Sequence, residues 1–392
     1  MSNPEFVDAV VVGGGMVGAS IALALGQAGY SVMLVEEQPI PSLPAATDPF
    51  DVRVSALSNA SIDFLAQLGV WPILRESRHA PYRRMRVWDQ AGAGDVSFHA
   101  RDTGFPYLGV ILENQVIQAG LWQAVAQCPA IRPAQAVQPQ HWQAGKAFGT
   151  LTLSDGRRVQ TSLLIGADGA HSWVRQHIGL EIRRHDYDTA AQVLSVHTAY
   201  PQQDITWQRF TPQGPQAFLP LAGARGSLVW YDQPDRVAAR QALSDDALLR
   251  VVHQAFPPEL GEITAIERRA SFPIRRLHAA RYQAARTVLI GDAAHTIHPL
   301  AGQGVNLGFA DARALFDCLK DQADLGLAAL LMRYERNRRA DNLTVQYGMD
   351  AFHYGFRETN PLAVRLRNAG LMITEHCPPL RRRLAQFASG ER

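Results

Sequence analysis

The chain has 392 residues, more than the roughly 100–200 residues of one ordinary domain, which predicts two domains. Apolar residues make up 47% and charged residues 19%, so we expect a large buried core, and a disordered chain is excluded. The formal net charge of +2, without a block of Lys and Arg, argues against a nucleic-acid-binding surface, and we expect no nucleic-acid partner.

The sequence also argues against a membrane span and a metal site. The apolar stretch from Val7 to Leu25 is interrupted by four glycines and lacks the positively charged start of a signal peptide. Cys128, Cys318 and Cys377 are far apart and form no C-x-x-C pair, as is typical of a reducing cytosol. We therefore expect a soluble cytoplasmic protein without a bound metal.

The first 36 residues predict a β-α-β unit. Residues 7–12 are almost continuously apolar and rich in valine, which is typical of a buried parallel strand. A glycine-rich turn and an Ala/Leu-rich helix follow, and the helix ends near Gly29. A second strand is expected at residues 31–35, and it closes with Glu36.

The middle of the chain predicts mixed elements and then a second sheet. After a proline-rich loop, helices are expected at residues 58–68 and 114–126, with a β-hairpin at 84–99 between them. Alternating strands are expected at residues 147–168. The stretch 188–232 is rich in strand-forming residues and predicts an antiparallel sheet.

A buried-strand pattern returns at residues 287–290, and long helices are expected at 304–319 and 325–348. A nucleotide-binding domain that begins the chain and resumes near residue 287 must enclose the middle sheet. The sequence therefore predicts two interleaved domains.

The first motif with a chemical meaning is Gly13-x-Gly15-x-x-Gly18, between the first strand and the first helix, with Glu36 21 residues after Gly15. The glycines allow a tight turn and a close approach of the backbone to a pyrophosphate at the helix N-terminus. The carboxylate of Glu36 can accept hydrogen bonds from the ribose hydroxyl groups but would repel a 2′-phosphate. The motif predicts FAD or NAD rather than NADP; a merely tight helix–strand turn is the alternative.

The second motif runs from Gly291 to Asn306. Asp292 lies at a strand end, where its carboxylate can hold a sugar-like polyol, and a helix is expected to open at about Gly304. The helix N-terminus offers backbone donors to negative charge that develops on a reduced flavin ring. The alternative is an ordinary loop with glycines for packing.

The third motif is Asp168-Gly169, again at the end of an expected strand, and Arg175 follows it. A carboxylate beside a glycine can belong to a dinucleotide site. A β-turn followed by a capped helix is an equally good interpretation from the sequence alone.

In this order and spacing, the three motifs resemble the FAD-dependent aromatic-ring hydroxylases of the para-hydroxybenzoate hydroxylase fold, over most of the chain. Further stretches resemble the ubiquinone-biosynthesis hydroxylases of that fold: residues 51–58, 68–71, 81–84, 210–212, 217–221, 229–232 and 349–352. The resemblance implies that NADH or NADPH reduces bound FAD and that O2 then forms a C4a-hydroperoxyflavin. Its terminal oxygen is transferred to a polyprenylated quinol of the 2-polyprenyl-3-methyl-6-methoxy-1,4-benzoquinol type.

The resemblance also implies which residues bind FAD: Gly13, Gly15, Gly18, Glu36, Arg53, Asn114, Asp168, Asp292, Gly302, Gly304, Val305 and Asn306. Glu36 would bind the adenosine ribose, and Asp292 the ribityl and pyrophosphate region. Val305 and Asn306 would face the flavin pyrimidine edge through their backbone. Pro299 would lie near the reactive face of the ring, and no catalytic acid or base is implied.

The fold class expected from the resemblance is α/β: a Rossmann-like FAD-binding domain with an interleaved antiparallel substrate sheet and a helical C-terminus. The expected division is FAD-binding domain at 1–80, 106–186 and 276–348, substrate hairpin at 81–105, substrate sheet at 187–275, and a basic helical tail at 349–392.

Two groups of side chains have both a functional and a structural interpretation. Five titratable side chains could either transfer protons or have a purely structural role: His171, His295, His298, Tyr231 and Tyr354. Four aromatic side chains could either line a substrate pocket or belong to the core of the sheet: Trp207, Phe210, Phe218 and Trp230.

The C-terminal part is basic: residues 333–392 contain eleven arginines and six acidic residues. Residues 361–376 mix apolar side chains with arginines, a pattern that can lie on an anionic bilayer. The alternative is a solvated helix that packs on its own protein. The expected partners are the quinol, O2 and either a membrane surface or a ubiquinone-biosynthesis complex, which would place the protein in the cytoplasm or peripherally on the inner face of the cell membrane.

Other functions remain open at this point. They are a sister hydroxylase that acts at another ring carbon, a flavin reductase of prenyl chains, and a non-catalytic FAD-fold protein that binds prenyl lipids. The sequence does not decide between NADH and NADPH, because it contains no separate pyridine-nucleotide motif.

Overall fold

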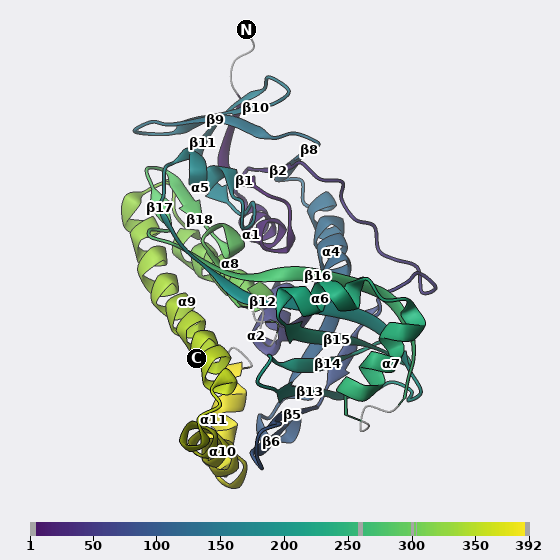
Figure 1. Ribbon diagram of the computed structural model, residues 1–392. Helices are drawn as coiled ribbons and strands as arrows, with labels where there is room; N and C mark the ends of the chain where they lie inside the picture. Colours follow the sequence, from purple (N-terminus) through teal and green to yellow (C-terminus); the bar gives the residue numbers. More distant parts are fainter. Residues whose placement is uncertain (1–4, 258–261, 299–301, 303, 389–392) are drawn as a thin grey trace.

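The computed structural model describes residues 5–257, 262–298, 302 and 304–388 (Figure 1). Its strands form three sheets: a mostly parallel sheet, a large mostly antiparallel sheet, and a small sheet beside them. The α/β class with an interleaved antiparallel sheet and a helical C-terminus is confirmed.

The first sheet has the strand order β17-β18-β11-β1-β2-β8, and β10 and β9 extend it from β11. The bounds are β1 (Glu5–Val12), β2 (Val32–Glu36), β8 (Ile131–Gln135), β9 (Pro139–Ala144), β10 (Gly149–Leu153), β11 (Arg158–Gly166), β17 (Gln283–Ala284) and β18 (Thr287–Leu289). Strands β18, β11, β1, β2 and β8 are parallel, and α1 (Met16–Gln27) packs against α4 (Asn114–Ala126) and α8 (Gly304–Leu319). Helices α4 and α8 have the predicted bounds.

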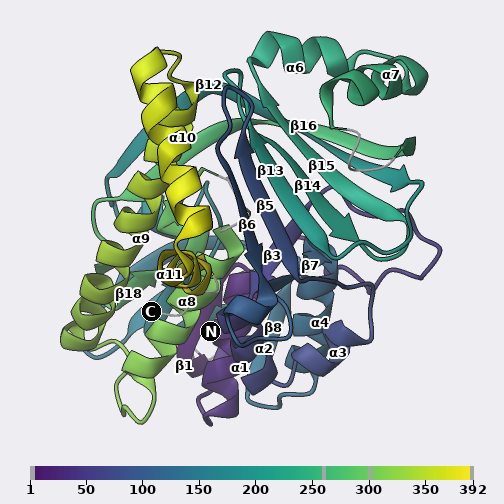
Figure 2. The same cartoon turned by 90° about the horizontal axis from the view of Figure 1, so that it is seen from below.

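The second sheet has the order β19-β16-β12-β15-β14-β13-β5-β6. The bounds are β5 (Arg84–Asp89), β6 (Asp95–His99), β12 (Ile182–Thr198), β13 (Ile205–Phe210), β14 (Gln216–Leu221), β15 (Arg225–Asp232), β16 (Ile263–Ala279) and β19 (His295–Thr296). One pair, β5 with β13, is parallel, because the β5–β6 hairpin joins the sheet from a distant part of the chain. Helices α6 (Pro234–Gln241) and α7 (Asp245–Ala255) lie over one face of this sheet (Figure 2).

The third sheet has the order β3-β7-β4 and lies beside short helices. Its strands are β3 (Val54–Ser58), β7 (Gly109–Glu113) and β4 (Ala80–Tyr82), with α2 (Asn59–Gln67) and α3 (Trp71–Arg75) nearby. The side chain of Ser58 caps α2 by accepting a hydrogen bond from the backbone N–H of Ser61. This sheet joins the proline-rich loop to the rest of the molecule.

Strands β12 and β16 are both 17 residues long and pair along almost their whole length. They run across the residues where the sequence analysis places domain boundaries, near 186 and 275. The residue ranges of the domains stay a prediction.

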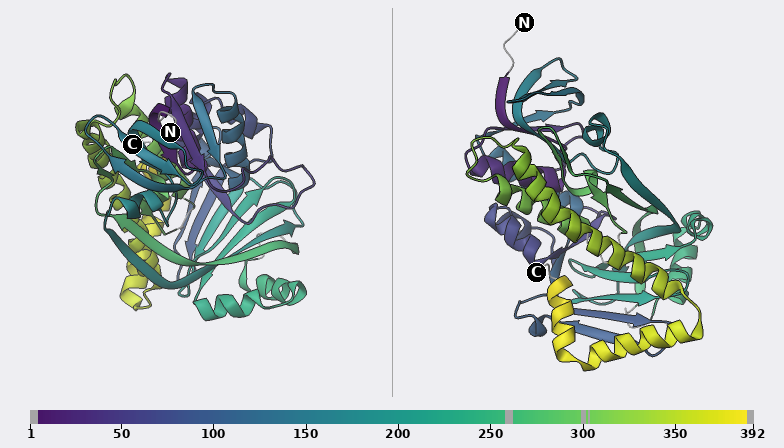
Figure 3. Two further views of the ribbon diagram at one scale, coloured as in Figure 1. Left: turned by 90° about the horizontal axis from the view of Figure 1, so that it is seen from above. Right: turned by 90° about the vertical axis from the view of Figure 1, so that its left-hand side faces the viewer.

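The C-terminal helices are α9 (Ala328–Arg357), α10 (Pro361–His376) and α11 (Pro378–Ala388). Helix α9 continues past Gly348, where the predicted helix ends, because one glycine costs only about 1 kcal/mol and no proline follows until Pro361. Figure 3 shows α9 running along the molecule and α10 turning back beside the second sheet.

Among the helices that the structure describes, none combines the length and the apolar character needed to span a bilayer.

Candidate functional site

The glycine turn between β1 and α1 has the shape that a phosphate group requires. Gly13 has φ of +99°, and a Cβ atom on Gly18 would lie 1.8 Å from the carbonyl oxygen of Gly13. A Cβ on Gly15 would meet no atom within 4 Å, so open space lies beside the start of α1. No side chain caps α1, and its first turn contains no acidic residue. Its free N–H groups can therefore bind an anion.

Glu36 lies directly beside this turn, at the end of β2. Its Oε2 accepts a hydrogen bond of 2.6 Å from the backbone N–H of Gly14, and its Oε1 accepts one from Gln38. Two side chains of α4, Gln118 and Trp122, donate to the carbonyl oxygen of Gly14 at 3.1 and 2.8 Å. The helix follows from the sequence, but no local pattern links residue 14 to residues 118 and 122, so these contacts could not be predicted.

Arg53 and Asn114 are brought together by the small third sheet. The backbone N–H of Asn114 donates to the carbonyl oxygen of Arg53 at 2.9 Å, and Ser55 Oγ donates to Asn114 Oδ1 at 2.6 Å. Glu113, which is fully buried, accepts a hydrogen bond from the N–H of Asp51. The segment that carries Arg53 is thus fixed on both sides.

Asp168 follows β11 and lies against the glycine turn, since a Cβ on Gly13 would be 2.8 Å from its Cα atom. Its Oδ2 accepts a hydrogen bond from Val174 N–H, and Ser172 caps α5 (Trp173–His177), which is the geometry of the alternative interpretation. Burial raises the pKa of the Asp168 carboxyl group, although hydrogen bonds from Ser172 and Val174 oppose the shift. Its Oδ1 is buried and has no hydrogen-bond partner among the described residues, so it can still accept one from a ligand.

The loop after β18 packs on α1. Gly291 begins a short 3-10 turn with φ of +57°, and Cβ atoms on Gly291 and Gly308 would both contact Val17. Arg175 donates to the carbonyl oxygens of Ala293 and Ala170, each at 2.7 Å, and so ties this loop to the segment after Asp168. The structure thus brings together the three motifs that are separate in the sequence.

Asp292 faces a cavity, called here the Asp292 cavity, and is reached by solvent through it. Protein surrounds its other sides, and this loss of solvation raises the pKa of the Asp292 carboxyl group. Asp311 on α8 holds the loop from behind. It accepts hydrogen bonds from the N–H of Gly291 and from His295, at 3.1 and 2.5 Å.

Asp311 is completely buried and also pairs with Arg338 on α9, at 2.7 Å. Burial alone would raise the pKa of Asp311, but His295 and Arg338 together hold it below its usual range. Asn342 donates a further hydrogen bond to the same carboxylate. Asp311 therefore joins the Asp292 loop, α8 and α9 in one ionised cluster, which the sequence analysis missed because its partners are far apart in the chain.

The N-terminus of α8 lies where the sequence analysis expects it, at Gly304. The Asn306 side chain accepts hydrogen bonds from Ser58 N–H and Ser61 Oγ and donates to Ala56, which fastens α8 to β3 and α2. Gly302 has φ of +64°, as a left-handed turn before the helix requires. Pro299 lies outside the described residues.

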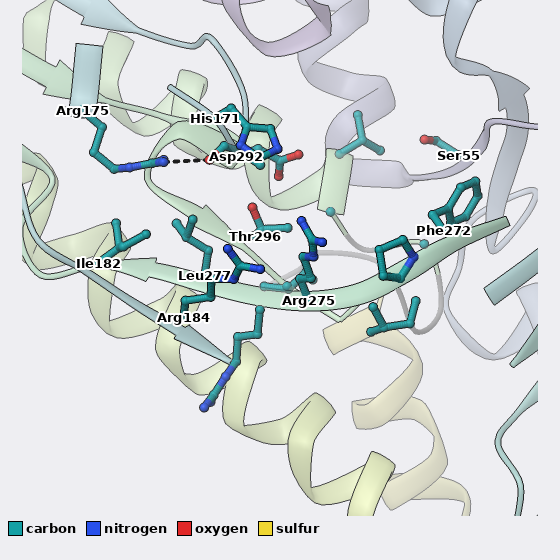
Figure 4. Close-up of a pocket in the computed structure, with 18 of the residues that line it drawn as sticks. Ser55, His171, Arg175, Ile182, Arg184, Phe272, Arg275, Leu277, Asp292 and Thr296 are labelled. Atoms are coloured by element: carbon teal, nitrogen blue, oxygen red, sulfur yellow. Dashed lines mark hydrogen bonds between the residues drawn. The ribbon is translucent and has the colours of Figure 1, made fainter. Parts of the chain in front are cut away.

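Two adjacent cavities lie beside the Asp292 loop and the start of α8. The Asp292 cavity has a volume of about 590 Å³, and Figure 4 shows Asp292 and His171 on one side of it and Arg184 and Arg275, from β12 and β16, on the other. A second, larger cavity of about 1070 Å³, called here the apolar cavity, is lined mostly by apolar side chains of the second sheet and of α8 to α11. Both cavities are lined by Val54, Phe272 and Gly302 and are therefore adjacent.

The predicted residues divide between these places. The Asp292 cavity is lined by Asp292, Gly302, Gly304 and Val305, and the apolar cavity by Arg53, Asn114, Gly302 and Asn306. The glycine turn holds Gly13, Gly15, Gly18, Glu36 and Asp168. A dinucleotide with its pyrophosphate at Gly15 and its ring near Val305 fits this arrangement, because Gly15 and Gly304 both face open space and α1 offers uncapped N–H groups.

The aromatic and titratable candidates also separate. Trp207 and Phe210 line the apolar cavity, and Trp207 also belongs with Phe218 and Trp230 to the core beneath α7. Tyr231 lines the apolar cavity, and burial raises the pKa of its hydroxyl group far above 10. His298 stacks on Tyr231, and burial lowers the pKa of His298 to about 3.

The other three titratable candidates lie away from the apolar cavity. His295 is bound to Asp311, His171 is exposed at the rim of the Asp292 cavity, and Tyr354 is exposed and contacts His185. None of these three side chains lines the apolar cavity.

Comparison with known sequences agrees with this geometry. A family model described as FAD binding domain matches residues 6–345. The 3-demethoxyubiquinol 3-hydroxylase of Escherichia coli (strain K12) is 41% identical over 386 residues, which cover 97% of each chain. The mitochondrial ubiquinone biosynthesis monooxygenase COQ6 of Homo sapiens is 32% identical over 99% of this chain and 93% of that protein.

Solved structures show the same fold. The p-nitrophenol 4-monooxygenase PnpA from Pseudomonas putida DLL-E4 superimposes with a TM-score of 0.79 at 18% identity, covering 99% of both chains. PqsL of Pseudomonas aeruginosa, in complex with 2-aminobenzoylacetate, gives a TM-score of 0.77 at 22% identity over 94% of this chain and 100% of that chain. At these identities the likeness concerns the fold alone.

Proposed function

The chain belongs to the family of FAD-dependent hydroxylases that includes its relatives in ubiquinone biosynthesis, and on this premise we propose that it hydroxylates the ring of a polyprenylated quinol. The reaction would use FAD, O2 and either NADH or NADPH. The cofactor, the quinol and the place of reaction each have a counterpart among the described residues.

The chain would hold FAD along the line from the glycine turn to the start of α8. Gly15 and the N-terminus of α1 would bind the pyrophosphate, and Glu36 the adenosine ribose. Asp292 would bind the ribityl region, and the N-terminal backbone of α8 at Val305 would face the ring. When bound, FAD supplies the redox chemistry: it accepts a hydride from the pyridine nucleotide and activates O2 for transfer of one oxygen atom.

The apolar cavity is the observation that carries the proposal. Its lining includes Gly302 and Asn306, beside the expected ring position, and Leu371 and Leu384 of the C-terminal helices. Its volume of about 1070 Å³ and its apolar lining suit a ring with a long hydrocarbon tail. A small polar substrate would leave most of this surface unused.

The cavity also keeps water away from the reacting ring. Apolar side chains of β15 and α8, such as Val229 and Phe309, form part of its wall. The hydroxyl group of Tyr231 is neutral at pH 7, and burial raises its pKa still further above that pH. It can therefore donate a hydrogen bond to a quinol oxygen without adding a charge to the cavity.

The test is spectroscopic and chemical. The purified protein should carry the absorption of bound flavin and should oxidise NADH or NADPH with O2 when a short-chain quinol is present. With ¹⁸O₂, mass spectrometry should find one labelled oxygen atom in the quinol product. A protein that cannot be loaded with FAD, or that consumes O2 without labelling the quinol, would contradict the proposal.

The ring position is a second question. The relative named as a 3-hydroxylase is 41% identical and COQ6 is 32% identical, which favours the position of the former. Quinone intermediates in a strain that lacks this protein would identify the blocked step. Accumulation of a compound that lacks a different hydroxyl group would assign the chain to the other position.

A polyprenylated quinol is nearly insoluble in water, so the protein must meet it at a membrane surface or in a lipid-carrying complex. We place the protein peripherally on a membrane. The basic C-terminal region, with eleven arginines and six acidic residues, favours an anionic surface.

A further inference from the structure

Helix α10 turns its polar side toward the protein. Arg367 Nε lies 2.6 Å from the buried carboxylate of Asp89, and Asn368 Nδ2 donates to the same carboxylate at 2.7 Å. Asn368 Oδ1 also accepts from the backbone N–H of Gly94. These contacts fasten α10 to the β5–β6 hairpin by hydrogen bonds and an ion pair (Figure 2).

The outer side of the same helix is apolar. Leu362, Leu366 and Ile373 are 65%, 66% and 60% exposed, and Ala369 lies between them. These four residues, called here the α10 stripe, follow one face of the helix at spacings of four, three and four residues. A surface helix normally buries its apolar side. Single exposed leucines are common, but a continuous stripe opposite a buried polar face indicates that something covers it.

Exposed arginines lie on the same two C-terminal helices as the α10 stripe and the residues after it. Arg365 lies beside the stripe on α10, and Arg382 and Arg383 are exposed on α11. Within the described part of the chain, none of these three arginines forms an ion pair. An apolar strip with cationic side chains nearby is complementary to the boundary between anionic headgroups and acyl chains.

The inner side of these helices lines the apolar cavity. Gly370, Leu371 and Thr374 of α10 and Leu384 and Ala385 of α11 all contribute to its wall. Leu384 is also 42% exposed on the outside. Helices α10 and α11 thus separate the apolar cavity from the surface that carries the α10 stripe.

We propose that the α10 stripe is seated in the headgroup–acyl boundary of an anionic phospholipid bilayer, and that the prenyl tail enters the apolar cavity from the bilayer beneath α10 and α11. The inference rests on the proposed function, because a lipid substrate explains why the cavity ends under this surface. Arg365 beside the stripe, the exposed arginines of α11 and the adjoining cavity favour an anionic bilayer over a second copy of the chain, which would need none of these features.

The experiment uses the full-length, FAD-loaded protein with vesicles of phosphatidylcholine containing phosphatidylglycerol. Leu366→Gln with Ile373→Gln should weaken vesicle binding by about tenfold or more, because two inserted apolar side chains are lost. The control is Leu327→Gln with Met332→Gln at the opposite end of α9, two apolar positions that are 46% and 50% exposed, and it should bind like the wild type. Arg365→Gln should weaken binding about fivefold, and only where phosphatidylglycerol is present.

Activity separates this inference from the proposed function. The α10-stripe variant should hydroxylate a soluble short-chain quinol at the wild-type rate and lose turnover of a long-chain quinol embedded in vesicles. Unchanged vesicle binding by this variant would overturn the inference. So would a wild-type dimer, measured by light scattering, that the same substitutions convert to a monomer. If the wild type does not hydroxylate the soluble quinol, the proposed function is wrong. Vesicle binding by the variants then still tests whether the α10 stripe contacts a membrane.

Discussion

The proposed cofactor side of this molecule, with the glycine turn and the Asp292 loop, and the proposed substrate side, with the apolar cavity, are built in different ways. On the cofactor side, short contiguous segments supply open backbone at Gly15, a strand-end carboxylate at Glu36 and a loop fixed by Asp311. On the substrate side, the apolar cavity collects single side chains from the second sheet and from α8 to α11. A dinucleotide cofactor is recognised by a few fixed backbone and side-chain geometries. A hydrophobic substrate needs mainly an apolar cavity of suitable size and shape. Changes on one side should therefore leave the other intact.

The largest effect is expected at Asp311 on the cofactor side. Asp311→Ala leaves Arg338 and His295 buried without their carboxylate and should lower the free energy of unfolding by about 3–5 kcal/mol. It should also weaken FAD binding, because the Asp292 loop loses its support. Denaturant unfolding and FAD titration measure the two effects. The control is Tyr334→Phe, which removes one buried hydrogen bond to Leu289 and should lower the free energy of unfolding by about 1 kcal/mol. An equal loss of stability in both variants would contradict the view that Asp311 holds the cluster together.

The glycine turn should be nearly as sensitive. Gly18→Ala puts a Cβ atom 1.8 Å from a backbone oxygen, so the turn must shift at a cost of about 3 kcal/mol, and FAD affinity should fall with it. Fluorescence titration with FAD and thermal unfolding are the measurements. Gly348→Ala in α9, where a Cβ meets no atom within 4 Å, should be neutral or stabilising by up to about 1 kcal/mol. Full FAD affinity in Gly18→Ala would show that the turn does not bind the pyrophosphate.

Acid should destabilise the fold through two buried histidines in contact, His298 behind Tyr231 and His353 of α9. Burial lowers the pKa of His298 to about 3 and that of His353 to about 4, whereas both are near 6.5 in the unfolded chain. The unfolded state therefore binds protons first as the pH falls, and stability is lost from about pH 6.5 downward. At pH 5 the loss should be about 2 kcal/mol for each histidine. Denaturant unfolding at pH 7 and pH 5 tests this. His353→Asn should reduce the pH effect by about 2 kcal/mol, and an unchanged pH effect would show that His353 is not its source.

The smallest effect is expected from narrowing the apolar cavity. Val229→Phe adds a ring to the cavity wall in β15 and should raise the KM for a long-chain quinol about tenfold, or roughly 1.4 kcal/mol. FAD affinity should not change, because Val229 does not line the Asp292 cavity. Steady-state kinetics with long-chain and tail-free quinols, together with FAD titration, give the comparison. An equal rise in KM for both quinols would indicate a general distortion rather than a block to the tail.

The division between the two sides also explains what the sequence could predict. The β-α-β unit, the bounds of α4 and α8 and the glycine turn follow from periodicity and local chemistry, so they could be predicted. The contacts of Gln118 and Trp122 with Gly14, and of Asp311 with Arg338, join distant residues and leave no local pattern. The end of α9 was missed because a glycine at residue 348 is tolerated within a long, packed helix. Which of the predicted residues contact FAD stays a prediction.

The long pair of strands β12 and β16 has a mechanical consequence. The strands pair along most of their 17 residues, and the register shifts between Asp186 and Ala190 and again between residues 195 and 198. On one side of residues 186–190 the strands lead to the Asp292 cavity, and on the other they form the middle of the second sheet. We expect this strand pair to bend most easily at these interruptions, above all at residues 186–190, where the shift is largest. The continuous pairing on either side resists bending, so a motion between the Asp292 cavity and the middle of the second sheet would turn about these residues.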